Sequence, residues 1–479
     1  MRTSESSPFI MDFRLLQDTI CAIATPIGEA GIGLIRLSGP EALDMARKIF
    51  SPKNSSLPLK SHTLHYGWIK DPVSGGVVDE VLLSYMAAPK TYTREDVIEI
   101  NCHSGYTVLN RILELVLATG ARLAQPGEFT RRAFLNGRID LSQAEAVIEI
   151  IRSRSEQGML LANRHLRGDF REQIERWRET LIQAQTRLEA FLDFSEDLAA
   201  ETEEEAPAYE SLLEEVHNAV TAPLRTTLDR YEEGRVLREG LTLVLVGKPN
   251  VGKSSMLNAL LGKDRAIVTA APGTTRDVIE DTFVLKGVQV RILDTAGIRN
   301  EPDEIESCGI ERTMRSVSEA DVVLWLIDNS RPLTSEDQKV YEAVRGSRSI
   351  VLLNKSDLPP VFPIENVLQR FAHPGPVFRL SVRNPSDIER LKTYLAEAFI
   401  MRPVENCRSE IVPNIRQKEC LENAMSALVR AEELLASNAY GELVSMEIEG
   451  ARRQLEAILG WESDGELLDR VFLQFCVGK

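Results

Sequence analysis

The stretch Gly247-Lys-Pro-Asn-Val-Gly-Lys-Ser-Ser255 follows the apolar run Leu241-Thr-Leu-Val-Leu-Val246 and precedes a helix expected over 256–261. A strand that leads into Gly-x4-Gly-Lys-Ser and then a helix is typical of the phosphate-binding loop of nucleoside triphosphatases. The glycines let successive N–H groups face an anion, and the helix N-terminus adds its partial positive charge. We expect Lys253 to reach the β- and γ-phosphates and the Ser254 hydroxyl to ligate Mg²⁺.

Further motifs follow in the order that a GTPase requires. Asp294-Thr-Ala-Gly297 comes after a strand-like run, so its carboxylate can hold the metal through water and its glycine can meet a γ-phosphate. Asn354-Lys-Ser-Asp357 also follows a strand-like run, Ile350-Val-Leu-Leu353. An aspartate there can accept hydrogen bonds from guanine N1–H and the 2-amino group, and adenine offers neither donor. The sequence therefore predicts GTP as the nucleotide.

The switch segments between these motifs are unusual at one position. Gly273-Thr-Thr-Arg-Asp277 supplies Thr275, which can complete the Mg²⁺ shell when a γ-phosphate is present. In Ras-like proteins a glutamine after Asp-Thr-Ala-Gly orients the attacking water, but here apolar Ile298 holds that place. Carboxylates follow within Arg299-Asn-Glu-Pro-Asp-Glu-Ile-Glu306, although a solvated loop is the alternative interpretation of such an acidic run.

Two further polar residues belong to the predicted nucleotide site. Asn250 offers a side-chain oxygen that can help hold a monovalent cation beside the phosphates. Ser381-Val382, after Val377-Phe-Arg-Leu380, stands where a guanine-contacting Ser-Ala is typical, so the valine is a departure from the pattern.

Length and composition limit the remaining possibilities. A chain of 479 residues should hold about three domains. With 56 basic and 72 acidic residues its net charge is −16, so any RNA contact must be local or made by a partner. The six cysteines are scattered without metal-type pairs, which favours reduced thiols and a cytoplasmic location. No apolar run reaches membrane-spanning length.

The secondary structure that the sequence predicts changes along the chain. Residues 1–136 alternate short β-rich segments with turns and predict an α+β domain, with strands at 19–24, 33–37, 78–83 and 96–100 and a helix at 108–117. Residues 137–239 and 398–479 are predominantly helical, and 240–397 hold the GTPase motifs. One helical stripe recurs every three or four residues, at Ile174, Trp177, Leu181, Ala184, Leu188 and Phe191. The helical domain is therefore predicted to be discontinuous, with the GTPase inserted into it.

Several motifs outside the GTPase segment carry a family resemblance: Thr25-Pro26, Gly31-Ile-Gly-Leu-Ile-Arg-Leu-Ser-Gly39, Glu95-Asp-Val-Ile-Glu-Ile100, His103-Ser-Gly105, Pro126-Gly-Glu-Phe-Thr-Arg-Arg-Ala-Phe-Leu-Asn136, Asp140-Leu-Ser-Gln-Ala-Glu-Ala146 and the terminal Phe475-Cys-Val-Gly-Lys479. Together with the GTPase motifs they resemble the MnmE family of tRNA uridine-modification GTPases, also called TrmE. The resemblance covers residues 18–479.

The resemblance implies a multidomain α/β fold with three parts: an N-terminal α+β tetrahydrofolate-binding domain that forms a homodimer, a discontinuous helical domain, and an inserted Ras-like P-loop GTPase domain. It implies GTP, Mg²⁺, K⁺ and 5,10-methylene-tetrahydrofolate as cofactors, with 5-formyl-tetrahydrofolate as an analogue of the last. The implied partners are tRNA and the FAD-dependent protein MnmG (GidA), with which the chain would form a heterotetramer. The resemblance implies no association with a membrane. The implied reaction places an aminomethyl or carboxymethylaminomethyl group on C5 of the wobble uridine, and hydrolysis accompanies dimerisation of the G domains across potassium.

Family roles are carried over residue by residue. The Mg²⁺ ligands are Ser254 and Thr275, and the K⁺ ligands are Asn250, Thr269, Ala271 and Thr274. The water-orienting glutamate is Glu306. The wider GTP site comprises Asn250, Val251, Gly252, Lys253, Ser254, Ser255, Thr269, Ala270, Ala271, Pro272, Gly273, Thr274, Thr275, Asp294, Thr295, Ala296, Gly297, Asn354, Lys355, Ser356, Asp357 and Ser381. The folate contacts are Arg36, Glu99, Arg138 and Lys479, and the thiol of Cys476 lies near the folate.

Chemistry supports the folate roles without deciding them. A pterin presents an amide and amino edge that a carboxylate such as Glu99 can read, and the glutamate tail of folate is anionic, matching Arg36, Arg138 or Lys479. For Arg36 a structural ion pair is the alternative, and a frayed terminus is the alternative for the Cys476 segment. Arg138 stands where some relatives have lysine. His103 is interpreted as structural.

Two other function classes compete with the resemblance. A ribosome-assembly GTPase would act as a switch without modification chemistry and would require a basic RNA-binding domain. A dynamin-like or septin-like GTPase would require a lipid-reading basic amphipathic segment. The sequence shows neither feature, and binding of a reduced folate would separate the family interpretation from both.

Overall fold

The computed structural model describes residues 18–54, 58–153, 155–197, 211–212, 214–262, 280–294, 314–371, 375–402, 411–437, 441–462 and 465–479. The chain divides into two compact units. The first comprises 1–148, 165–219 and 423–479, and the second comprises 149–164 and 220–422. The domain boundaries at 136, 239 and 397 stay predictions.

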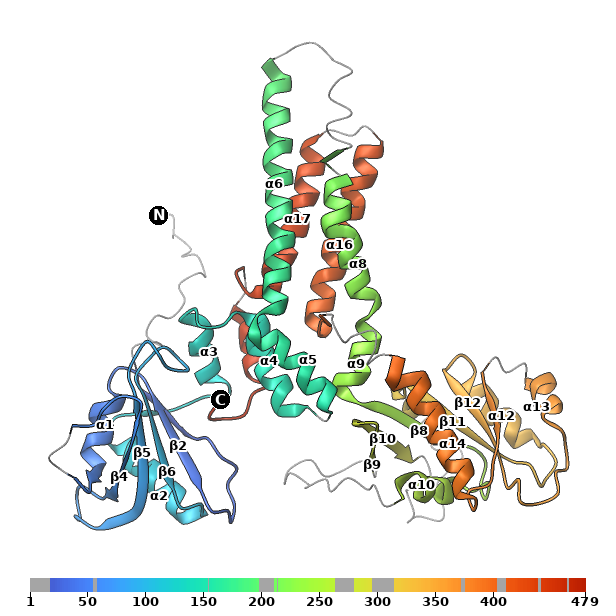
Figure 1. Cartoon of the computed structure of the whole chain (residues 1–479), viewed down its shortest axis with the longest axis horizontal. Coiled ribbons are helices and arrows are strands. Elements are labelled where there is room, and N and C mark those ends of the chain that lie inside the picture. Colours follow the sequence, from blue (N-terminus) through green and yellow to red (C-terminus); the bar gives the residue numbers. More distant parts are fainter. Residues whose placement is uncertain are drawn as a thin grey trace, which may run out of the picture. The chain divides into compact units, whose positions relative to one another are not determined.

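The first unit contains a seven-stranded sheet in the order β3-β4-β5-β6-β2-β1-β7 (Figure 1). Its strands are β1 (Ile20–Ile23), β2 (Gly33–Ser38), β3 (Phe50–Pro52), β4 (Thr63–Lys70), β5 (Val77–Met86), β6 (Val97–Cys102) and β7 (Arg122–Leu123). All neighbours are antiparallel except β1 and β7. Two helices, α1 (Ala42–Ile49) and α2 (Tyr106–Ala118), pack on one face and close a core with it.

The opposite face of this sheet is covered only in part. On the β1 side, Ile20 and Ala22 pack against Phe129 of helix α3 (Glu128–Leu135). On the β4–β5 side, Tyr66 lies opposite Leu82 in the strand register, and both side chains are exposed to solvent, as is that of Leu64. The alternation along each strand therefore leaves an apolar row uncovered at one end of the face.

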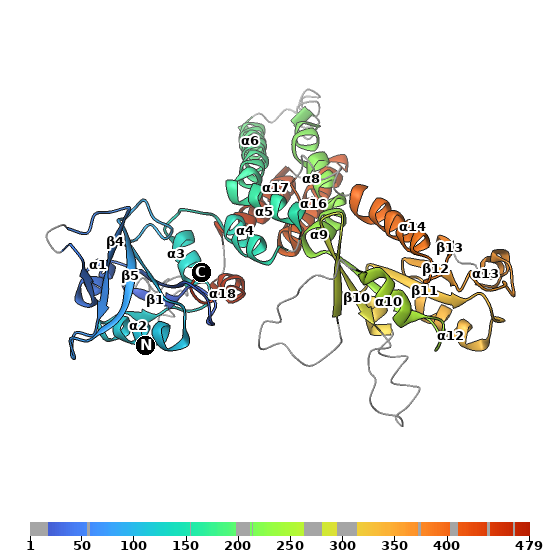
Figure 2. The same ribbon diagram turned by 60° about the horizontal axis from the view of Figure 1, so that its bottom comes forward.

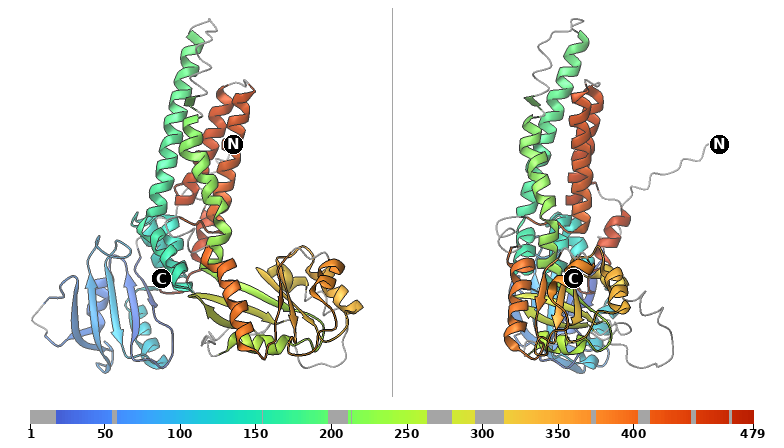
Figure 3. Two further views of the ribbon diagram at one scale, coloured as in Figure 1. Left: turned by 45° about the vertical axis from the view of Figure 1, so that its right-hand side comes forward. Right: turned by 90° about the vertical axis from the view of Figure 1, so that its right-hand side faces the viewer.

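Long helices complete the first unit. Helices α6 (Asp169–Asp197), α17 (Gly441–Leu459) and α18 (Gly465–Phe472) lie within it. Helices α4 (Leu141–Arg152), α5 (Glu156–Arg167) and α16 (Ile415–Ala436) extend across the unit boundary, and most of α5 belongs to the second unit. Helices α6 and α17 lie side by side along much of their length (Figure 3). The predicted stripe of α6 is confirmed as core from Ile174 to Leu188, and the Phe191 side chain lies outside the described residues.

The second unit contains a six-stranded sheet in the order β13-β12-β11-β8-β10-β9, parallel except for the β9–β10 pair (Figure 2). Its strands are β8 (Leu241–Val246), β9 (Glu280–Leu285), β10 (Val288–Asp294), β11 (Val322–Asp328), β12 (Ser349–Asn354) and β13 (Val377–Arg379). The described helices within this unit are α8 (Ala222–Asp229), α9 (Tyr231–Glu239), α10 (Lys253–Leu261), α12 (Ser335–Val344), α13 (Ile364–Phe371), α14 (Pro385–Ala396) and η3 (Glu397–Met401), and η2 (His217–Thr221) extends across the unit boundary.

Both faces of the second sheet are covered, as a parallel sheet requires. Leu243 and Leu245 point into one core with α10 and α14, and Val244 and Val246 point into another with α12 and α13. This is the doubly wound arrangement, and it confirms the predicted Ras-like architecture. The helix expected to begin at 256 begins at Lys253, because the loop turns through Gly252 directly into the first helical residue.

Candidate functional site

The phosphate-binding loop lies at the carboxyl end of buried strand β8. Gly247 and Gly252 have φ values of +152° and +105°, and Asn250 has a φ of +66°. A Cβ on Gly247 would lie 2.5 Å from the Leu326 carbonyl oxygen, and one on Gly252 would lie 2.5 Å from Asn354 Nδ2. Backbone angle and lack of space therefore both require glycine at these two positions. This agrees with the expectation that the glycines allow the loop to curl.

The lysine of the loop is folded back over it. Lys253 Nζ donates to the carbonyl oxygens of Gly247, at 2.6 Å, and of Lys248, at 3.1 Å. Ser254 and Ser255 are exposed in the first turn of α10, where a hydroxyl can reach a metal bound at the phosphates.

The guanine motif is bonded directly to the phosphate loop. The buried Asn354 side chain donates to the Val251 carbonyl oxygen at 2.8 Å and accepts from the backbone N–H of Val382 at 3.2 Å. The Val382 departure thus leaves a backbone contact to the motif in place. Lys355 Nζ donates to the Asn250 carbonyl oxygen at 3.1 Å. Ser356 N–H donates to the Leu380 carbonyl oxygen at 3.2 Å, so two motifs and the 380–382 turn form one bonded structure.

The aspartate expected to bind guanine is held by the predicted serine. Ser381 Oγ donates to Asp357 Oδ1 at 2.7 Å, and this hydrogen bond lowers the pKa of Asp357. The carboxylate is therefore ionised at neutral pH and can accept hydrogen bonds.

Asp328, which ends strand β11, was missed by the sequence argument. Its carboxylate is buried and lies 2.7 Å from Lys355 Nζ. Burial alone would raise the pKa of Asp328, but hydrogen bonds from Lys355 and Ser330 lower it below the usual value. The signal in the sequence was an acidic residue directly after the apolar run 322–327.

Several predicted nucleotide residues lie outside the described residues: Thr269, Ala270, Ala271, Pro272, Gly273, Thr274, Thr275, Thr295, Ala296, Gly297, Ile298 and Glu306. Asp294 ends strand β10, and its side chain is likewise outside the described part. Their assignments stay predictions.

A second cluster forms in the first unit, where the end of the chain meets the sheet. Arg36 on β2 lies opposite Glu99 on β6, and Arg36 Nη2 lies 2.7 Å from Glu99 Oε1. Arg36 Nη1 also donates to the Gly478 carbonyl oxygen at 2.9 Å. Gly478 has a φ of +94°, and a Cβ there would lie 2.8 Å from the Ala24 Cα. The tail is therefore docked at a position where only glycine fits.

The last four residues, 476–479, lie beside this ion pair. Phe475 is buried beside Phe472, and the Cys476 carbonyl oxygen accepts from the backbone N–H of Gly127 at 3.4 Å. The Cys476 thiol is exposed. Burial and the adjacent Arg36 guanidinium lower the pKa of Lys479. Burial disfavours any charge here, whereas the positive charge of Arg36 specifically favours an anion beside Lys479, which would also stabilise the Lys479 ammonium.

Arg138 reaches the same region through Tyr92. Its guanidinium lies 4.7 Å from the centre of the Tyr92 ring, and Nη1 donates to the Tyr92 carbonyl oxygen at 3.2 Å. The Arg36 guanidinium lies 5.7 Å from the Phe129 ring centre. Burial raises the pKa of Tyr92 while the charges of Arg138 and Arg36 oppose that rise, so both guanidinium groups act on one ring. The structure thus brings the four predicted folate residues and Cys476 into one neighbourhood.

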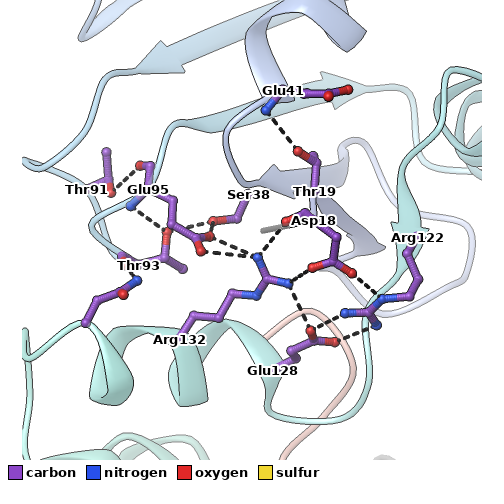
Figure 4. A network of polar contacts seen from close by, with 11 residues as sticks. Asp18, Thr19, Ser38, Glu41, Thr91, Thr93, Glu95, Arg122, Glu128 and Arg132 are labelled. Atoms are coloured by element: carbon purple, nitrogen blue, oxygen red, sulfur yellow. Dashed lines mark hydrogen bonds and ion pairs between the residues drawn. The ribbon is translucent and has the colours of Figure 1, made fainter. Parts of the chain in front are cut away.

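An ion network surrounds the buried Arg132 of helix α3 (Figure 4). Arg132, which is 1% exposed, contacts carboxylates of Asp18, Glu95 and Glu128. Arg122 lies 2.6 Å from Asp18 and 2.5 Å from Glu128. Burial raises the pKa of Glu95 despite Arg132. The network ties the start of β1 to α3 and so fixes the helix that carries Phe129.

His103 is paired outside this network. Its Nδ1 lies 2.8 Å from Asp79 Oδ1, and the hydrogen bond to that carboxylate raises the pKa of the exposed imidazole. Among the described residues, no group of three or more His, Cys, Asp or Glu side chains could hold a metal ion. None of the described helices combines the length and apolar character needed to cross a bilayer.

Comparison with known proteins identifies the family of the chain. The family described as GTP-binding protein TrmE N-terminus matches residues 19–138, and the family described as MnmE helical domain matches residues 141–476. The chain belongs to the MnmE family. A protein of this family from Syntrophobacter fumaroxidans, "tRNA modification GTPase MnmE", is 55% identical over 98% of this chain and all of its own length.

Other MnmE relatives are similar over the same span. Proteins with the same printed name from Carboxydothermus hydrogenoformans and Geobacillus kaustophilus are 45% and 43% identical. They cover 97% and 96% of this chain, and 100% and 99% of their own lengths are matched. Membership of the MnmE family confirms the resemblance seen in the sequence motifs.

Proposed function

We propose that this chain is a GTP hydrolase acting in tRNA modification, and that its N-terminal domain binds a reduced folate as the source of a one-carbon unit. The nucleotide part rests on the bonded arrangement of the phosphate loop with Asn354, Lys355 and Asp357. The modification part rests on membership of the MnmE family, whose relatives carry that activity in their names.

The docked tail carries the folate proposal. Arg36 binds Gly478, which fixes Lys479 and Cys476 beside the Arg36–Glu99 pair. Among the described residues, neither Arg138 nor Lys479 forms a salt bridge with a carboxylate. Two cations without salt-bridge partners favour an anionic ligand, and the glutamate tail of a folate supplies carboxylates. A structural role for the Arg36–Glu99 pair alone would not require the chain end to dock there.

The folate supplies the carbon that joins C5 of the wobble uridine as part of an aminomethyl or carboxymethylaminomethyl group. In this proposal Glu99 reads the pterin edge, Arg36 fixes Glu99 and the tail, and Arg138 and Lys479 bind the anionic end. The Cys476 thiol lies beside the folate in a nucleophilic or redox role. An FAD-dependent partner of the MnmG (GidA) kind completes the reaction on tRNA in a heterotetramer.

The GTP site fits Mg²⁺ and K⁺ by its donor types. Ser254 is exposed at the start of α10, and Ser254 and Thr275 would hold Mg²⁺ through hydroxyl oxygens. Asn250 is held in the left-handed region with its carbonyl bound by Lys355. With Thr269, Ala271 and Thr274 it would form the K⁺ site, and Glu306 would orient the attacking water in place of a Ras-type glutamine. Hydrolysis would accompany G-domain dimerisation.

A homodimer fits the incompletely covered sheet face of the first unit. Leu64, Tyr66 and Leu82 form an exposed apolar row there, on the face that also carries Arg36 and Glu99. Burial of such a row against a second copy would remove apolar surface from water. The dimer would thus lie beside the proposed folate site.

Titration of the full chain with 5-formyl-tetrahydrofolate tests this proposal. We expect saturable binding by the wild type, weakened at least about tenfold in Lys479→Met because a charge-assisted hydrogen bond contributes about 1.5–3 kcal/mol. Lys90→Met removes an exposed lysine of the same domain and should bind within about twofold of wild type. A wild-type chain that binds no reduced folate would contradict the proposal, and so would equal binding by the Lys479 and Lys90 variants.

A further inference from the structure

The phosphate loop contains a second lysine, Lys248, whose ammonium contacts the start of helix α12 and not the loop carbonyls that Lys253 contacts. Lys248 Nζ lies 2.7 Å from Asp337 Oδ2 and 3.4 Å from Thr334 Oγ1. The Lys248 side chain is 11% exposed and that of Asp337 is 1% exposed. A lysine side chain that is this little exposed and pairs with a buried carboxylate is uncommon, because both groups give up hydration to meet.

The partner carboxylate belongs to the start of a helix. Thr334 is the N-cap of α12, and Asp337 Oδ2 accepts from the Thr334 backbone N–H at 2.8 Å and from Thr334 Oγ1 at 2.9 Å. This capping box does not itself require a lysine. Asp337 Oδ1 is buried without a hydrogen-bond partner, so Lys248 supplies the neutralising cation for a carboxylate that is otherwise cut off from water.

The backbone of Lys248 takes part in the nucleotide machinery. Its carbonyl oxygen and that of Gly247 both accept hydrogen bonds from the Lys253 ammonium. The direction of those carbonyls depends on the path of the chain from Gly247 to Pro249, and the Lys248 side chain fixes that path to α12. A displaced loop would carry the Lys253 acceptors and the neighbouring N–H groups with it.

A second anchor acts on the other side of the loop. Lys355 joins the Asn250 carbonyl oxygen to the buried Asp328 carboxylate, which ends β11. The segment from Asp328 to Asp337 therefore holds the phosphate loop at two points through two lysine–carboxylate pairs. The Lys355 contact comes from the guanine motif, whereas no recognised nucleotide motif accounts for the Lys248 contact.

We propose that Lys248 is a positioning residue for GTP binding: its ion pair with Asp337 pins the entry of the phosphate loop to α12 and thereby prepositions Lys253 and the loop N–H groups. This inference rests on the proposed GTP hydrolase function. It assigns Lys248 no contact with the nucleotide and no proton transfer. Loss of the pair leaves the loop able to reach the bound conformation only as one of several, which lowers affinity.

The test compares GTP affinity and thermal stability in variants of the full chain. Lys248→Met should weaken GTP binding at least about tenfold, and Lys248→Arg should remain within about threefold of wild type because it keeps the charge and the hydrogen bond. Lys339→Met is the matched control, since Lys339 is an exposed lysine on the same helix α12. It should change neither affinity nor melting temperature.

The double variant Lys248→Met/Asp337→Asn separates positioning from stabilisation. Lys248→Met alone leaves a buried carboxylate without its cation and should lower the melting temperature, and the added Asp337→Asn removes that charge while keeping a polar group for the capping box. We expect the double variant to regain stability and still bind GTP at least about tenfold more weakly than wild type. Recovery of affinity together with stability would reduce Lys248 to a structural role, as would a folded Lys248→Met within threefold of wild type. Failure of the wild-type chain to bind GTP would contradict the proposed function instead.

Discussion

The substitution Gly478→Ala tests most directly whether the C-terminal tail, residues 476–479, is docked on the sheet. Gly478 has a φ of +94°, and a Cβ there would lie 2.8 Å from both the Ala24 Cα and the Ile23 carbonyl oxygen. An L-residue in a left-handed conformation costs roughly 1–2 kcal/mol. Displacing the tail also loses the hydrogen bond from Arg36 to the Gly478 carbonyl, worth about 1.5–3 kcal/mol for a charged donor. Because that hydrogen bond is lost only when the tail leaves, it is not added to the strain: the strain alone shifts the docking equilibrium toward the undocked tail by about 1–2 kcal/mol, or roughly fivefold to thirtyfold, and the clash of the added Cβ increases the shift.

Two assays measure this shift of the docking equilibrium. Carboxypeptidase B should release Lys479 faster from the variant, because the tail spends more time away from the sheet. Binding of 5-formyl-tetrahydrofolate should weaken at least about tenfold, since Lys479 leaves with the tail. GTP hydrolysis by the isolated full chain should stay unchanged, because the phosphate loop belongs to the other compact unit.

Gly465→Ala is the matched control in the same terminal segment. Gly465 begins α18, has no positive φ, and a Cβ there would meet nothing within 4 Å. It should match wild type in both assays. Gly478→Ala with wild-type folate affinity and wild-type release of Lys479 would refute the argument that the tail is docked by Arg36.

Three further outcomes are expected. GTP turnover should rise strongly with potassium and little with sodium, because Ile298 cannot orient water and Asn250 belongs to the proposed cation site; equal rates in the two salts would exclude that site. Glu306→Ala should bind GTP nearly as wild type but hydrolyse it roughly 10²-fold more slowly, the scale for losing a positioned acid–base group; turnover within about twofold of wild type would make Glu306 a loop carboxylate. Cys476→Ser should preserve folding, GTP hydrolysis and folate binding but impair uridine modification in a reconstitution with the flavin-dependent partner and tRNA; full modification would exclude a chemical role for the thiol.

The G-domain strands were predictable because each is a short apolar run that ends at a motif. Strands β8 and β12 were expected at 241–246 and 350–353 and are observed at Leu241–Val246 and Ser349–Asn354. Their burial on both faces gives continuous apolar runs, and the motifs fix where the runs end. Local sequence therefore contained both the element and its boundary.

The buried ion network was not predictable in the same way. Arg132 contacts Asp18, which is 114 residues earlier in the chain, and Glu95, which is 37 residues earlier. No local periodicity connects residues so far apart, and a charged residue on a helix is usually solvated. The Pro126–Asn136 motif signalled that the α3 region mattered, but not that its arginine was buried among carboxylates.

The two candidate sites also differ in how far they could be predicted from local sequence. The phosphate loop could be placed from sequence because its chemistry is local, whereas the meeting of Arg36 with Gly478 joins residues 442 positions apart. The family resemblance supplied that association as an expectation, and the strand register and tail contacts gave it a geometry. Lys248 was missed because its partner Asp337 lies 89 positions away, at the start of another helix.

Nucleoside mass spectrometry of tRNA from cells that lack this chain tests the central claim most directly. The account predicts loss of the aminomethyl or carboxymethylaminomethyl group from C5 of the wobble uridine, with the modification restored by the wild-type chain and not by Lys253→Ala, which removes the phosphate-binding lysine. Wobble uridines that keep the full modification in the absence of this chain would contradict the assignment of this GTP hydrolase to tRNA modification.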